Sequence, residues 1–313
     1  MDRMIRTLID DFLTSQEIPS QTPSTEFEQF SNYCLIANEV TSGFDLEETM
    51  TGEGDDLGID GISFVLNGKI VNSTDEIDFL LEQNITLEAT IFFIQAKTSK
   101  RFDSGEILKF GMGVSDFVSE SPKLKMNESI ENFRILFSYI IKKSPKLREN
   151  PKCKMFYVTN GNWTGDQNIV GTKLTIISNL ENTNLFSEIQ FDFLGVKEIS
   201  KIYRMSKLTT STTFSFSNRV TLPEVDTIEQ SYFGILPLKE FKKILMDENN
   251  NMLSIFNDNV GDYQGDRNNV NSNMYDTLQS PTNELFMLLN NGVTIVASNL
   301  KPSGNKFDLP PKS

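Results

Sequence analysis

Large apolar residues alternate along the segment 61–66, at Ile62, Phe64 and Leu66, as in a strand with one buried face. An Asn-Gly dipeptide at 67–68 is a two-residue hairpin signal, so we predict that the chain reverses there into a second strand at 69–72. A longer apolar run at 86–97 predicts a third strand beside the first two. These segments indicate the beginning of a β-sheet.

Apolar residues at helical spacing predict helices before and after these strands. Helices and strands alternate as far as about residue 205, which favours one α/β domain whose sheet is covered by helices on both faces. The predicted helices lie at about 3–14, 25–40, 104–119, 129–143 and 166–180, with a Ser/Thr/Pro linker at 19–25 between the first two. Residues 74–84 form a brief helix or loop, and two further strands lie at 154–159 and 188–194.

The character of the sequence then changes. A Ser/Thr-rich run at 209–217 is strand-like or linker-like and marks a domain boundary. An amphipathic helix is predicted at 238–246, and a strand at 293–297 follows an Asn-rich segment. The 313 residues suit two domains of ordinary size, so we predict an α/β domain at 1–205 and a partial α+β domain at 206–313.

Composition removes several classes of enzyme. The chain has no histidine, which excludes Ser-His-Asp hydrolysis, Cys-His proteolysis and the phosphodiesterases that depend on histidine. Its two cysteines are far apart in sequence and are expected to be reduced core thiols. The absence of a long apolar run and of a signal-peptide pattern predicts a cytoplasmic protein without a membrane contact.

The net charge of −14 argues against a protein that coats nucleic acid non-specifically. A nuclease can still be acidic overall, because it needs only a local cationic path and a metal ion. Lys100 and Arg101 directly follow the third predicted strand and are the candidates for contact with nucleic acid.

Three residues at the ends of neighbouring strands form a candidate catalytic set. Asp60 leads the first strand, and Gln95 and Lys97 end the third, where their spacing of two puts both side chains on one face. A carboxylate and an amide oxygen can hold a divalent cation, while a lysine orients or deprotonates the attacking water. The alternative is that Asp56 and Asp60 are turn residues and Lys97 is a solvated strand end.

This set resembles the PD-(D/E)XK nuclease superfamily in its Mrr-like variant, where Gln replaces the second acid. The resemblance implies a restriction-endonuclease-like mixed sheet flanked by helices, and Mg²⁺ or Mn²⁺ held by Asp60 and Gln95. It also implies a further acid on the helix before the Asp. A Phe-Glu pair there matches Glu28, which is favoured as the additional ligand; Glu39, three turns further along the predicted helix, is the alternative.

The chain also resembles the abortive infection phage resistance (AIPR) family, through a series of landmarks in its last third. That family likewise carries an N-terminal Gly-Ile-Asp-Gly, here at 58–61, with a later Gln-x-Lys, so the resemblance covers nearly the whole chain. The resemblance implies anti-phage defence, and an AIPR-type domain that is incomplete here because family members continue further. Gly261 stands where the family usually has Arg. The alternative for the Asn-Asn-Gly element is a tight turn that leads into a strand. The landmarks are Asn259-Val260-Gly261-Asp262, Gly265, Val270-Asn271, Thr277-Leu278 and Asn290-Asn291-Gly292-Val293-Thr294.

The leading hypothesis is therefore a divalent-metal-dependent endonuclease that cuts DNA rather than RNA during abortive infection. The contrasting hypothesis is a catalytically silent nuclease-like module that binds nucleic acid or a phage protein as a sensor. Expected partners are DNA, a second copy of the chain or a phage-encoded trigger.

Overall fold

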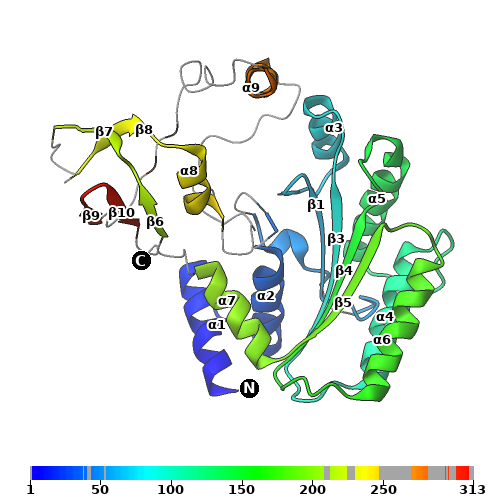
Figure 1. The fold of residues 1–313 in the computed structure, drawn as a ribbon. Helices are drawn as coiled ribbons and strands as arrows, with labels where there is room; N and C mark the ends of the chain where they lie inside the picture. The colour runs from blue at the N-terminus through cyan, green and yellow to red at the C-terminus, as the bar shows by residue number, and fades with distance from the viewer. Residues whose placement is uncertain are drawn as a thin grey trace. The chain divides into compact units, whose positions relative to one another are not determined.

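The chain divides into two compact units, Met1–Arg204 and Met205–Ser313 (Figure 1). Each unit has its own apolar core among the described residues. Among the residues that the structure describes, no helix is long and apolar enough to cross a bilayer. The structure is a computed structural model, and it describes residues 2–37, 39–40, 44–52, 54–207, 212–223, 230–246, 269–280, 293, 295 and 301–309.

The first unit is built on a five-stranded mixed sheet with the strand order β2-β1-β3-β4-β5. β1 runs antiparallel to both β2 and β3, whereas β4 and β5 run parallel to β3. The predicted hairpin is present, and both of its turn residues, Asn67 and Gly68, have positive φ. The strands are β1 (Gly61–Leu66), β2 (Lys69–Ile70), β3 (Ala89–Lys97), β4 (Lys152–Thr159) and β5 (Glu188–Leu194).

Helices cover both faces of this sheet, as the sequence predicts (Figure 1). One face packs against α1 (Arg3–Ser15), α2 (Pro23–Ile36) and α7 (Val196–Lys207). The other packs against α3 (Thr74–Gln83), α4 (Ser104–Val118), α5 (Glu128–Lys142) and α6 (Gln167–Glu181). Short 3₁₀ helices lie at η1 (Glu47–Thr49) and η2 (Ser144–Lys146). The α/β fold class is therefore confirmed.

α2 differs from its predicted bounds by more than one residue, and one ambiguous segment is now assigned. α2 begins at Pro23, inside the segment predicted to be a linker, because Thr22 caps it and proline is well suited to the first helical turn. α2 also ends at Ile36, earlier than the predicted 40. The ambiguous segment 74–84 is a helix, since Ser73 and Glu76 form a reciprocal capping box at its start.

β3 is buried on both faces because both sets of its alternating residues are apolar. Ile91 and Phe93 belong to the core beneath α4 and α5. Phe92 and Ile94 belong to the core beneath α1 and α2. Gln95 lies on the same face of β3 as Ile91 and Phe93, so a polar side chain is buried at a position in an otherwise apolar row.

The second unit contains a three-stranded antiparallel sheet with the order β6-β10-β9 and a hairpin of β7 and β8. Its described core is formed by Phe214, Ile244 and Phe307. Most of the strand predicted at 293–297 lies outside the described residues, and Val293 and Ile295 are not in a strand. The elements are β6 (Thr212–Ser215), β7 (Asn218–Thr221), β8 (Tyr232–Ile235), α8 (Leu238–Leu245), α9 (Asn269–Gln279), β9 (Lys301–Ser303) and β10 (Lys306–Leu309).

Candidate active site

Asp60 lies at the edge of the sheet, immediately before β1, and is held there by two hydrogen bonds to β3. Its backbone N–H donates to the carbonyl of Ile94 (2.8 Å), and its Oδ2 accepts the N–H of Ala96 (2.8 Å). Lys97 Nζ lies 3.6 Å from the same Oδ2. The structure therefore brings Asp60 and Lys97 together, with the carboxylate 8% exposed and the lysine side chain 33% exposed.

Gln95 is the second buried polar group at this edge, and its side chain is 1% exposed. A Cβ added at Gly58 would lie 3.4 Å from Gln95 Nε2, so the loop before β1 packs against the amide. In the described part of the chain, no group donates a hydrogen bond to Gln95 Oε1. Leaving a buried acceptor without a donor costs about 1–3 kcal/mol, which a ligand to this oxygen would recover.

The carboxyl group of Asp60 has an unusual acidity. Burial raises its pKa from 3.8 to about 7, because the charged form loses the hydration that it has in water. The positive charge of Lys97 and the N–H of Ala96 oppose this rise, and the negative charge of Glu28 adds to it. A cation bound at Asp60 would favour the charged form and remove much of this penalty.

The two glutamates considered for the additional ligand have different surroundings. Glu28 is close enough to Asp60 for its charge to raise the pKa of that carboxyl, and its Oε1 accepts a hydrogen bond from Ser24 Oγ (3.1 Å). Glu39 instead forms an ion pair with Lys154 (2.6 Å). Of the two, Glu28 is the one whose charge acts on the carboxyl group of Asp60.

The loop that leads into Asp60 has a strained backbone. Gly54, Asp55, Leu57 and Gly58 all have positive φ, a conformation that costs non-glycine residues free energy. Asp56 stabilises the loop from within, because its Oδ1 accepts the N–H of Gly58 (2.7 Å). Asp56 is thus a turn residue, whereas Asp60 contacts β3.

Two residues that the sequence did not single out hold this loop from outside. Asn127 caps α5 and also donates from Nδ2 to the carbonyls of Thr51 (3.0 Å) and Gly54 (2.9 Å). Gly113 lets α4 approach the loop, since a Cβ there would lie 1.9 Å from the carbonyl oxygen of Leu57. The sequence shows Asn127 as a possible helix cap and Gly113 as a glycine within a predicted helix, but it does not indicate which loop either residue contacts.

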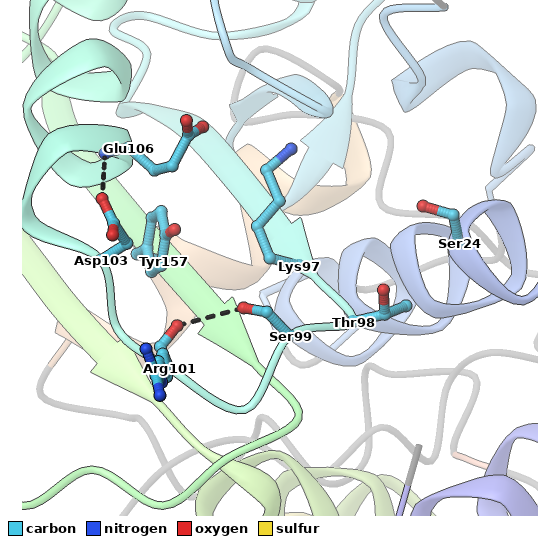
Figure 2. Close-up of a pocket in the computed structure, with 8 residues that line it drawn as sticks. All are labelled: Ser24, Lys97, Thr98, Ser99, Arg101, Asp103, Glu106 and Tyr157. Atoms are coloured by element: carbon cyan, nitrogen blue, oxygen red, sulfur yellow. Dashed lines mark hydrogen bonds between the residues drawn. The ribbon is translucent and has the colours of Figure 1, made fainter.

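An open cleft of about 430 Å³ adjoins the site at the carboxyl ends of β3 and β4 (Figure 2). Of the two cations predicted to contact nucleic acid, Arg101 lines this cleft together with Lys97, and Lys100 is exposed on the same loop. Two acids at the N-terminus of α4, Asp103 and Glu106, line the same cleft. The lining residues are Ser24, Lys97, Thr98, Ser99, Arg101, Asp103, Glu106 and Tyr157.

Carboxylates alone do not make a metal centre here. Within the described ranges, no three histidine, cysteine, aspartate or glutamate side chains gather closely enough to hold a metal ion. A cation at Asp60 would therefore also depend on the amide oxygen of Gln95 and on backbone carbonyls.

The predicted motif of the second domain is only partly described. Asn271 lies in α9. Asn259, Asn290, Asn291 and Gly292 lie outside the described residues.

Comparison with known proteins gives one match. Residues 256–309 match a family model described as AIPR protein, which supports the predicted resemblance to the AIPR family. The match lies within the second unit and does not include the candidate active site. Neither the curated proteins nor the solved structures contain a match to this chain.

Proposed function

We propose that this protein is a divalent-metal-dependent endonuclease that cuts DNA, in preference to RNA, in anti-phage defence by abortive infection. The observation that carries the nuclease proposal is the buried Gln95 Oε1, which has no donor within the described residues and belongs to the strand whose Ala96 and Lys97 contact Asp60. The defence role rests on the AIPR match at residues 256–309.

The donor atoms fit a hard cation. Asp60 supplies a carboxylate, Gln95 an amide oxygen and Glu28 a second carboxylate, and oxygen ligands of this kind are preferred by Mg²⁺ and Mn²⁺. Such a cation, when bound, polarises the phosphate and lowers the pKa of a water molecule. The raised pKa of Asp60 supports this role, because a bound cation would stabilise the charged carboxylate that burial disfavours.

Lys97 has a separate role in this proposal. Its ammonium group, 3.6 Å from Asp60 Oδ2, lies at the edge of the cleft where a phosphate would enter. There it orients the attacking water and stabilises the negative charge that increases on the phosphoryl oxygens. Arg101 is placed on the cleft wall to contact a phosphate of the same strand.

A second candidate is the catalytically silent module that binds nucleic acid or a phage protein. It is favoured by the lack of a three-carboxylate cluster among the described residues. It is also favoured by Asp103 and Glu106, which add negative charge to the cleft of a chain that already carries −14. It does not explain why the amide oxygen of Gln95 is buried without a donor on the strand that contacts the Asp60 carboxylate.

One assay separates the two candidates. The full chain is incubated with Mg²⁺ or Mn²⁺ and with plasmid, linear duplex DNA, single-stranded DNA and RNA, and Mn²⁺ binding is measured by calorimetry. We expect cleavage of DNA and Mn²⁺ binding, both lost in Asp60→Asn and retained in Asp75→Asn, which alters an exposed acid of α3. Cleavage of no substrate, with Mn²⁺ binding unchanged by Asp60→Asn, would refute the nuclease proposal.

A further inference from the structure

Tyr157 stands next to Gln95 on the neighbouring strand. The parallel register of β3 and β4 pairs Gln95 with Tyr157, and paired residues of adjacent strands project from the same face. Tyr157 also lines the cleft that Lys97 and Arg101 line (Figure 2). The phenol therefore belongs to the wall of the candidate active site, although the sequence indicated only a buried strand at this position.

The ring of Tyr157 is fixed by its packing. Its centroid lies 6.2 Å from that of Phe102, 6.4 Å from that of Phe110 and 6.4 Å from that of Phe193, and the residue is 1% exposed. A ring held by three aromatic neighbours loses little further freedom when it binds a ligand. Its hydroxyl is the polar end that this packing presents to the cleft.

The hydroxyl of Tyr157 has no partner of its own in the described part of the chain. Two other packed tyrosines contrast with it, because Tyr139 donates to Asp78 (2.6 Å) and Tyr203 donates to Asp11 (2.7 Å). Burial raises the pKa of Tyr157, and the negative charge of Glu106 adds to the rise. At neutral pH the group is a protonated, uncharged hydrogen-bond donor.

We infer that Tyr157 is a further catalytic residue, whose O–H donates a hydrogen bond to a non-bridging oxygen of the scissile phosphate. This inference rests on the proposed nuclease function. The acids Asp103 and Glu106 make the cleft unfavourable for a phosphate, and a fixed neutral donor offsets part of that repulsion. The hydrogen bond strengthens as charge moves onto the phosphoryl oxygen, and the proton stays on the phenol throughout.

The test combines Tyr157→Phe with sulfur substitution of the substrate. DNA is prepared with one scissile linkage as the ordinary phosphate and as each of its two phosphorothioate diastereomers, in which sulfur, a weak hydrogen-bond acceptor, replaces one non-bridging oxygen. We expect Tyr157→Phe to lower kcat on the ordinary phosphate on the order of 10²-fold, with little change in KM. On one diastereomer the same variant should lose much less, because the bond is already weakened there.

Tyr139→Phe is the matched control, since it removes a phenolic hydroxyl that bonds Asp78 away from the cleft. It should lower kcat by less than threefold, and equally on all three substrates. Each comparison is the ratio of the kcat values of one variant on two substrates. A partly folded preparation lowers both kcat values by the same factor, so the ratio is unchanged.

The possible outcomes separate the role of Tyr157 from the proposed nuclease function on which it rests. A parent protein that cleaves the DNA, with a Tyr157→Phe variant that is equally fast or loses the same factor on all three substrates, overturns the role of Tyr157 alone. A parent that cleaves no substrate overturns both the inference and the proposed function. A loss confined to the ordinary phosphate and one diastereomer supports both.

Discussion

Replacing Asp60 by asparagine should stabilise the metal-free protein, and more so at alkaline than at acidic pH. Asparagine has nearly the same shape and can still accept the N–H of Ala96, but it carries no charge to bury. The pKa of Asp60 is raised from 3.8 in water to about 7 in the fold. Its contribution to stability is therefore fully present below pH 3.8 and is lost as the pH rises through 7.

The size of the effect follows from that difference in pKa. The interval between 3.8 and about 7 corresponds to about 4 kcal/mol of unfolding free energy once the group is fully ionised. At pH 5 the unfolded chain is already ionised while the folded one is not, so part of this loss is present there. Between pH 5 and pH 8 the advantage of Asp60→Asn should therefore grow by about 2–3 kcal/mol.

Urea unfolding in a chelator at pH 5, 6.5 and 8 measures this difference, with the parent and Asp75→Asn as references. The single tryptophan, Trp163, lies in the first unit, so its fluorescence reports the unfolding of the unit that contains Asp60. Asp75 is exposed, and its variant should follow the pH dependence of the parent. If the stability of Asp60→Asn ran parallel to that of the parent across this pH range, the buried-carboxylate reasoning would be wrong.

Three further predictions concern the neighbours of Asp60. Lys97→Ala should lower kcat on the order of 10²–10³-fold in the cleavage assay while changing urea stability by no more than about 1 kcal/mol, and undiminished cleavage would make the lysine a mere strand end. Gln95→Met should raise the stability of the metal-free protein by about 1 kcal/mol and weaken Mn²⁺ binding in calorimetry, because the oxygen without a donor is gone. Glu28→Gln should also weaken Mn²⁺ binding whereas Glu39→Gln should not, and the reverse order would identify Glu39 as the ligand.

Much of the first unit could be predicted because its signals are local. Alternation and the Asn-Gly dipeptide determine β1 and β2, and the spacing of Gln95 and Lys97 puts both on one face of a strand whatever the rest of the chain does. The PD-(D/E)XK interpretation of these residues stays a prediction. Pro23 was misjudged as part of a linker because proline is compatible with both a linker and the first turn of a helix.

The remainder depends on contacts between distant residues. The pairing of Gln95 with Tyr157 follows from the register of β3 and β4, which apolar patterning does not determine. The contact of Asn127 with the loop before Asp60 joins residues more than 70 positions apart. In the second unit, β6 pairs with β10 at the far end of the sequence, and neither partner carries a hairpin signal for the other.

The close approach of Gly113 to Leu57 has a mechanical consequence. Glu106 in the first turn of α4 borders the cleft, and Gly113 is seven residues later, or about 10 Å along the helix axis. α4 thus lines the cleft where substrate would enter and also packs against the backbone of the loop that positions Asp60. A displacement of α4 along its axis would be transmitted to both places at once, so occupancy of the cleft and affinity at Asp60 are expected to be thermodynamically linked, each altering the other by the same factor.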